Sequence, residues 1–178
     1  NYGYLSVRAK THDHLLYVNN LCAVLLRVER YQEALQLMQS TTQEAKTTKN
    51  FHNRVGFVSF YMEAMNKNGL CKNAEQYGDS FLEAFPKEIL RYRWHLFFSV
   101  YLEALIQHQH FEKVLKVSTR FKLMDRDQTY RSKANYVPLI PFYIAVAKFQ
   151  EGLLPKGELL EALSKSFDGS NRKRKTSM

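Results

Sequence analysis

The sequence has few of the residues that force turns or form cross-links. Its 178 residues include seven glycines, four prolines, two cysteines and one tryptophan. A chain with so few glycines and prolines has few forced turns, which disfavours an all-β fold. Cys22 and Cys71 are too few for a disulfide framework or a cysteine-based metal site. This cysteine usage predicts an intracellular, reducing environment.

Long apolar runs and familiar catalytic motifs are also missing. No run approaches the roughly eighteen apolar residues of a membrane span, and no signal-peptide pattern opens the sequence. The sequence contains no glycine-rich phosphate loop, no nucleophile elbow and no His-Glu-x-x-His motif. We therefore expect a soluble protein that does not enter a membrane, is not an enzyme and carries no cofactor or metal.

Hydrophobic and basic residues are plentiful. The chain is 45% hydrophobic, with 12 Phe and 11 Tyr, so it is long and apolar enough to bury a core. The formal net charge is +9. Residues 1–110 hold 12 basic and 10 acidic side chains, and residues 111–178 hold 14 and 7, so most of the excess lies in the last third. Such a field attracts acidic protein surfaces or nucleic acid.

One sequence pattern recurs every forty residues. The segment YMEAM at 61–65 is repeated as YLEAL at 101–105, and NNLCAVLLRVERYQEALQLM at 19–38 fits the same frame one step earlier. Each copy has an apolar segment, a short polar break and an amphipathic segment with apolar residues three, four and seven apart. Since neither helix can bury its apolar stripe alone, this pattern predicts stacked helical hairpins.

The first copy resembles the tetratricopeptide repeat. Leu21, Cys22 and Leu25 match the large, small and large apolar positions of its first helix, and Tyr31 and Ala34 match the start of its second. In the second copy, Gly69, Ala74 and Pro86 match the family's turn glycine, alanine and closing proline. The period is 40 residues, whereas the family's is 34, and Met62, Leu102 and Val114 replace small residues.

The resemblance implies an all-α fold, a right-handed array of three to four antiparallel helical hairpins. We expect one repeat domain over residues 1–167, with copies near 12–50, 51–86, 87–124 and 136–167. The fourth copy is out of register, as terminal repeats often are. Residues 125–135 are expected to form a polar connection, and residues 168–178 a flexible basic tail.

In the tetratricopeptide family the first helices line a concave groove, so the resemblance implies a protein-binding surface on these helices. The function we predict is a non-catalytic interaction scaffold within a larger assembly. Exposed groove residues and two aromatic anchors next to a helix start are the candidate partner contacts: Asn19, Arg27, Ser59, Glu63, Lys67, Tyr92, Trp94 and Glu103. Asn19 occupies a position where the family often holds a peptide backbone with a side-chain amide.

Two patterns suggest chemistry but have simpler interpretations. Glu63 and Glu103 recur in register and resemble paired catalytic carboxylates, although a solvated or salt-bridged pair fits better because no nucleophile lies nearby in sequence. The histidines in HDH (12–14) and HQH (108–110) suggest a metal, but side chains two apart on a helix point about 200° apart. Only a turn could bring such a pair together.

An alternative function is nucleic-acid binding through the basic, aromatic-containing segments RYRWH (91–95) and RFKLMDRDQTYRSK (120–133). Basic side chains neutralise phosphates, and aromatic rings stack on unpaired bases. The basic candidates for such a surface are Arg91, Arg93, Arg120, Lys122, Arg126, Arg131 and Lys133.

The basic run Arg172, Lys173, Arg174 and Lys175 resembles a nuclear-import signal, which favours the nucleus over the cytoplasm. A solvated tail without a targeting role explains the same residues. The expected partners are one or more proteins with acidic surfaces, with nucleic acid as the alternative and self-association through apolar faces as a third interpretation.

Overall fold

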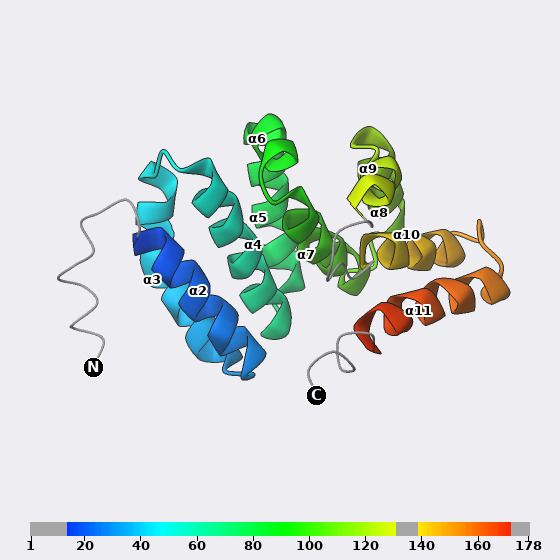
Figure 1. Ribbon diagram of the computed structural model, residues 1–178, viewed down its shortest axis with the longest axis horizontal. Coiled ribbons are helices and arrows are strands. Elements are labelled where there is room, and N and C mark those ends of the chain that lie inside the picture. Colours follow the sequence, from blue (N-terminus) through cyan, green and yellow to red (C-terminus); the bar gives the residue numbers. More distant parts are fainter. Residues whose placement is uncertain (1–13, 131–138, 172–178) are drawn as a thin grey trace. The chain divides into compact units, whose positions relative to one another are not determined.

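The computed structural model describes residues 14–130 and 139–171 (Figure 1). These residues form ten helices and no strand, so the all-α prediction is confirmed. The chain divides into two compact units, residues 1–104 and 105–178, with the boundary inside helix α7. The arrangement of the whole chain as one repeat array stays a prediction.

The first unit contains two helical hairpins, one short helix and most of a further helix. Its helices are α2 (His14–Arg27), α3 (Tyr31–Thr47), α4 (Phe51–Lys67), α5 (Cys71–Ala84), α6 (Pro86–Arg91) and α7 (Trp94–Gln107). Helix α2 packs against α3 and α4, and α4 packs against α3 and α5. Helices α2 and α4 therefore lie side by side, and both contact α3.

The forty-residue recurrence is present in the turns between helices. Glu29, Gly69 and Gln109 follow helices α2, α4 and α7, and they adopt left-handed backbone angles with φ of 61°, 74° and 59°. In each turn, the amide of the next residue donates to the carbonyl five positions back, for example Arg30 N to Leu25 O at 2.9 Å. This is the Schellman cap that ends many helices.

The same register governs the core. Ala34, Ala74 and Val114 are fully buried, as are Cys22, Met62 and Leu102 at the position of the family's small residue. Burying apolar side chains along one face of each helix is the main force that holds such hairpins together.

Gly78 on α5 permits an unusually close approach of another helix. A Cβ atom built at Gly78 would lie 2.6 Å from Cδ2 of Tyr101 on α7 and 2.9 Å from Sδ of Met62. The ring of Tyr101 is fully buried, and its hydroxyl donates to Asp79. Phe97 lies nearby, with its ring centroid 6.1 Å from that of Phe81 on α5. This face of α7 is therefore packed on the second helix of the preceding hairpin.

The second unit contains α8 (Phe111–Arg120), α9 (Leu123–Tyr130), α10 (Leu139–Gln150) and α11 (Lys156–Asn171). Helix α10 packs against α8, α9 and α11. Pro141 lies in the first turn of α10 and Pro155 directly precedes α11, where proline is tolerated.

Two sequence predictions in the second unit are wrong in detail. The polar segment 125–130 is helical, and α9 buries Leu123 and Asp127 while Met124 and Asp125 face solvent. Residues 168–171, predicted as the start of a flexible tail, continue α11. Residues 131–135 of the predicted connection lie outside the described residues, as do residues 172–178.

Candidate functional site

The first helices of the first unit carry a group of charged side chains. Lys67 on α4 lies 3.1 Å from Glu103 on α7, measured from Nζ to Oε1. Glu63 lies one turn before Lys67 on α4. We call Glu63, Lys67 and Glu103 the charged cluster. All three are among the sequence-predicted partner residues, and the ion pair gives a concrete form to the salt-bridged interpretation of the two glutamates.

Burial and charge both change the proton affinities in the charged cluster. Burial raises the pKa of Glu63, and the nearby Glu103 carboxylate adds to this rise while Lys67 opposes it. Burial alone would lower the pKa of Lys67, but Glu103 and Glu63 outweigh it, so the Lys67 pKa is raised. A carboxylate with a raised pKa can serve as a general acid. The arrangement supplies the proton but shows no reactive atom to receive it.

The thiol of Cys22 interacts electrostatically with this cluster from the interior of the unit. Burial first, and the Glu63 carboxylate second, raise the pKa of Cys22 to about 12. Because the thiolate is the nucleophile, such a thiol is unreactive at neutral pH. Cys22 is therefore a core residue, and it does not turn the charged cluster into a nucleophilic site.

Asn19 and Ser59 are not on the surface, so the prediction that they are exposed groove residues is wrong. Asn19 is 1% exposed, and its Nδ2 donates to the backbone carbonyl of Asn53 at 2.9 Å. Ser59 is fully buried, and its hydroxyl donates to Val55 O within α4. Small polar side chains at these positions satisfy helix carbonyls where a solvated groove residue was expected.

A second asparagine makes the same kind of bond one hairpin later. Nδ2 of the buried Asn66 donates to the carbonyl of Val100 at 3.1 Å, which joins α4 to α7 as Asn19 joins α2 to α4. In each case the amide crosses to the first helix of the next hairpin. The Oδ1 atoms of both side chains are buried without a partner in the described structure. Sequence reasoning missed this linking role, because periodicity alone does not tell a bonded amide from a solvated one.

Arg27, Tyr92 and Trp94 are at least partly accessible. Arg27 ends α2 and is exposed, and no acidic partner is described for it among residues 14–130 and 139–171. Tyr92 lies between α6 and α7, with its ring edge-on to His52 at 6.2 Å and Arg91 over its face. Trp94 begins α7 and is half-buried. These three residues keep the accessibility that a partner contact needs.

A group of polar side chains around Gly56, formed by Asn19, His52 and Arg93, was not predicted from the sequence. Arg93 has a left-handed backbone, with φ of 44°, and its Nε donates to Nε2 of His52 at 2.8 Å. A Cβ at Gly56 would lie 3.1 Å from both Nη1 of Arg93 and Nδ2 of Asn19. Burial lowers the pKa of Arg93, and burial together with Arg93 lowers that of His52. Gly56 therefore leaves room for two side chains that cross between helices.

The basic residues predicted to bind nucleic acid, in the alternative function, are distributed over both units. Arg91 and Arg93 belong to the first unit, where Arg91 covers Tyr92. In the second unit, Arg120 covers Phe121 and Arg126 donates to the Phe121 carbonyl at 3.1 Å, while Lys122 is exposed. Each of these two rings is thus already covered by an arginine of its own chain. Arg131, Lys133 and the basic run 172–175 lie outside the described residues.

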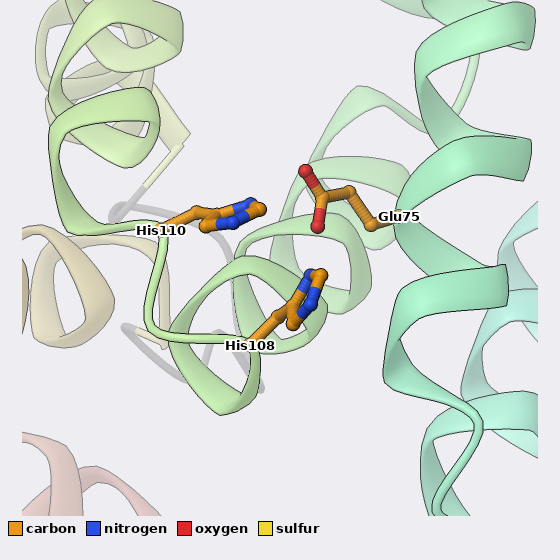
Figure 2. A group of neighbouring side chains, drawn as sticks. All are labelled: Glu75, His108 and His110. Carbon is orange, nitrogen blue, oxygen red and sulfur yellow. The ribbon is translucent and has the colours of Figure 1, made fainter.

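The two histidines at the end of α7 approach each other (Figure 2). The ring centroids of His108 and His110 are 4.2 Å apart, because the left-handed Gln109 between them turns the chain. The turn therefore brings together a pair that a helix would separate. Glu75, also drawn in Figure 2, belongs to α5 of the other unit. Two imidazoles are fewer than the three or four ligands of a typical zinc site, so the pair alone does not define a metal centre.

Comparison with known proteins adds no family assignment. No family model matches the sequence, and no curated protein or solved structure matches it either. Within the described parts of the chain, no helix combines the length and apolar character needed to cross a membrane.

Proposed function

We propose that this chain is a non-catalytic protein-interaction module of the tetratricopeptide-like helical-repeat type, working within a larger and nuclear assembly. The partner segment lies across the first helices α2, α4 and α7 of the first unit. The observation that carries this proposal is the row of charged side chains on these adjacent helices, formed by Arg27 and the charged cluster.

Arg27 and Lys67 have different parts in this proposal. Lys67 is held by Glu103, so its charge is already compensated inside the module. Arg27 is exposed at the end of α2, and its charge has no acidic partner among the described residues. A carboxylate on the partner therefore pairs with Arg27, while Lys67 and Glu103 keep α4 and α7 in place.

Enzymatic chemistry receives less support from the same residues. The charged cluster has one carboxylate with a raised pKa, but the neighbouring thiol is Cys22, whose own raised pKa of about 12 keeps it protonated. A general acid needs a bound substrate atom within hydrogen-bond reach, and nothing else in the cluster holds one.

The test is a quantitative pull-down with the tagged full chain as bait, comparing the wild-type protein with Arg27→Glu. The matched control is Lys72→Glu, which reverses an exposed charge on the second helix α5. We expect a specific partner whose retention falls roughly tenfold with Arg27→Glu, because a reversed rim charge repels the partner's carboxylate. The Lys72→Glu bait should keep the partner. Equal retention by all three baits would sink the proposal.

A second arm of this experiment examines nucleic acid. A filter-binding titration with mixed-sequence oligonucleotides at two salt concentrations measures phosphate contacts directly, because each contact steepens the fall of affinity with salt. Micromolar or weaker affinity, unchanged by Arg120→Glu, agrees with the interaction module. Tight binding that is lost on Arg120→Glu would favour the nucleic-acid function instead.

A further inference from the structure

Helix α2 carries an exposed apolar stripe that is not part of the charged row. Tyr17, Val24 and Val28 are 62%, 55% and 54% exposed, and the partly exposed Leu21 lies between them. The spacings of four, three and four residues place these side chains along one face of the helix. We call Tyr17, Leu21 and Val24 of α2, together with Val28 directly after the helix, the α2 end face. A continuous apolar face on a surface helix marks a contact site more often than isolated apolar residues do.

The positions equivalent to the α2 end face are covered in the next two first helices. Forty residues later, Phe57 and Ala64 of α4 are fully buried, and the side chain of Asn68 donates to the carbonyl of Tyr31 on α3 at 2.9 Å. Helix α4 packs against both α2 and α3, the preceding hairpin. At this junction Asn68 thus contacts the second helix of the preceding hairpin, whereas the partly buried Tyr61, equivalent to Leu21, packs its ring 5.1 Å from that of Tyr77 on α5.

The junction at α7 repeats the arrangement. Phe97, Tyr101 and Ala104, eighty residues after Tyr17, Leu21 and Val24, are all fully buried. Tyr101 packs on Gly78 and donates to Asp79, and Phe97 approaches Phe81. The receiving face on α5 has Ala74, Gly78 and Phe81, which are small or apolar and are spaced by four and three residues.

We propose that the α2 end face binds an amphipathic helix of a partner protein, which packs on α2 in the way that α5 packs on α7. The partner helix carries small and apolar side chains four and three residues apart, matching Ala74, Gly78 and Phe81. This contact continues the packing between hairpins already present in the first unit. None of the residues of the α2 end face belongs to the charged row, so this proposal does not depend on the proposed function.

A second copy of this chain fits less well than a different partner. The faces in the first unit that have this spacing are those of α3 and α5, and both are already used: Ala34, Met38, Ala74 and Gly78 are buried within their own copy. A second copy would have to offer another kind of surface. A helix from a different polypeptide can offer a free face of this kind.

Site-specific photo-crosslinking of the full chain in cells tests this proposal. The photoactivatable residue benzoylphenylalanine replaces Val24 in one protein and the exposed Asn73, on α5, in the control. After irradiation, mass spectrometry identifies the crosslinked peptide. We expect Val24 to capture one partner at least roughly fivefold more strongly than Asn73 does, because the buried centre of an interface dominates its contacts.

The expected crosslinked peptide contains small and apolar residues at spacings of four and three. Adding Tyr17→Glu should reduce capture at Val24 at least fivefold, while Lys72→Glu, on α5, should leave it unchanged. Since Tyr17 is largely exposed, circular dichroism should show the Tyr17→Glu protein folded.

Three results would each overturn the proposal. One is equal capture at Val24 and Asn73, and another is a partner peptide that lacks the required spacing. The third is a crosslink from Val24 to this chain itself, either to residues 1–13 or to a second copy, which sedimentation over a range of concentrations would tell apart. The two proposals can fail separately. Equal retention by the Arg27→Glu and wild-type baits would contradict only the proposed function, and the absence of specific capture at Val24 would contradict only the α2 end face proposal.

Discussion

The ring of Tyr101 packs so closely on Gly78 that a Cβ atom at residue 78 would lie 2.6 Å from Cδ2 of the ring. Real Cβ atoms essentially never approach a carbon atom that closely. The contact joins α5 to α7 inside the first unit, and the hydroxyl of Tyr101 fixes its position by donating to Asp79. This close contact determines how α7 packs against α5 of the preceding hairpin.

Gly78→Ala should therefore destabilise the protein, although alanine is the better helix former. Overpacking a core costs about 1–3 kcal/mol, more than the roughly 1 kcal/mol that alanine contributes over glycine in a helix. Urea unfolding followed by circular dichroism measures the change. Gly157→Ala is the control, because a Cβ there meets nothing within 4 Å, so that variant should be as stable as the wild type or more so. A stabilised Gly78→Ala protein would contradict the packing described.

Substitutions at two left-handed turn residues should change the free energy of unfolding in opposite directions. Glu29 has φ of 61° and Gly69, at the equivalent position, has φ of 74°. A left-handed residue other than glycine costs roughly 1–2 kcal/mol, and glycine loses part of this advantage through its flexible unfolded state. Glu29→Gly should thus raise the free energy of unfolding by about 0.5–1 kcal/mol, and Gly69→Ala should lower it by about 1 kcal/mol. Chemical denaturation of both variants checks the pair, and a change of the same sign in both would contradict it.

The raised pKa of Glu63 predicts how stability depends on pH. Burial, followed by the Glu103 charge, raises this pKa, so the folded protein holds a proton on Glu63 at pH values where the unfolded chain has lost it. Stability therefore falls as pH rises from the unfolded pKa, near 4.5, through the higher folded pKa. Glu63→Gln should remove this fall and raise the melting temperature more at pH 7 than at pH 4.

Thermal melts at the two pH values measure the effect of Glu63→Gln. Glu83→Gln, at an exposed carboxylate on α5, is the matched control and should shift both melts equally. If Glu63→Gln lowered the melting temperature at pH 7, the carboxylate would be stabilising, and the electrostatic description of the cluster would be wrong.

Cys22 should resist alkylation in the folded protein. Its side chain is fully buried, and burial together with Glu63 raises its pKa to about 12. In the Cys71→Ser background, iodoacetamide at pH 8 should modify Cys22 only as fast as the protein unfolds, because the reagent needs both access and a thiolate. Mass spectrometry over time with and without urea gives the two rates. Rapid labelling without urea would show that the core around Cys22 opens.

Much of the fold could be predicted from the sequence because helical hairpins leave local signals. The recurrence of YMEAM as YLEAL placed α4 and α7, and the turn at Gly69 has counterparts at Glu29 and Gln109 despite their different residue types. The copies share these turns because a Schellman cap depends on backbone hydrogen bonds. A glutamate, a glycine and a glutamine can all supply them. The helical state of 125–130 was missed because its pattern is mostly polar, and only the packing of Leu123 and Asp127 reveals a buried side.

The candidate site was predicted in part. Glu63, Lys67 and Glu103 were chosen by register, and the structure brings Lys67 and Glu103 together. Asn19 was chosen in the same way, yet it is buried and bonded to Asn53 O. Periodicity assigns a residue to a side of its helix, but whether that side meets solvent or the next helix depends on the distance between helices. The Arg93 and His52 contact joins residues forty-one positions apart without a shared motif, so no sequence signal pointed to it.

The sequence by itself determined that this chain is largely helical and where the turns after α2, α4 and α7 fall, because helix periodicity and turn hydrogen bonds depend on residues a few positions apart. The tertiary structure decided which polar residues are buried and which apolar residues stay exposed. Asn19 is enclosed because α4 lies against α2, whereas Tyr17 and Val24, two and five residues from Asn19 on the same helix, remain largely uncovered. Burial depends on what packs against each face, and that depends on contacts between helices distant in sequence.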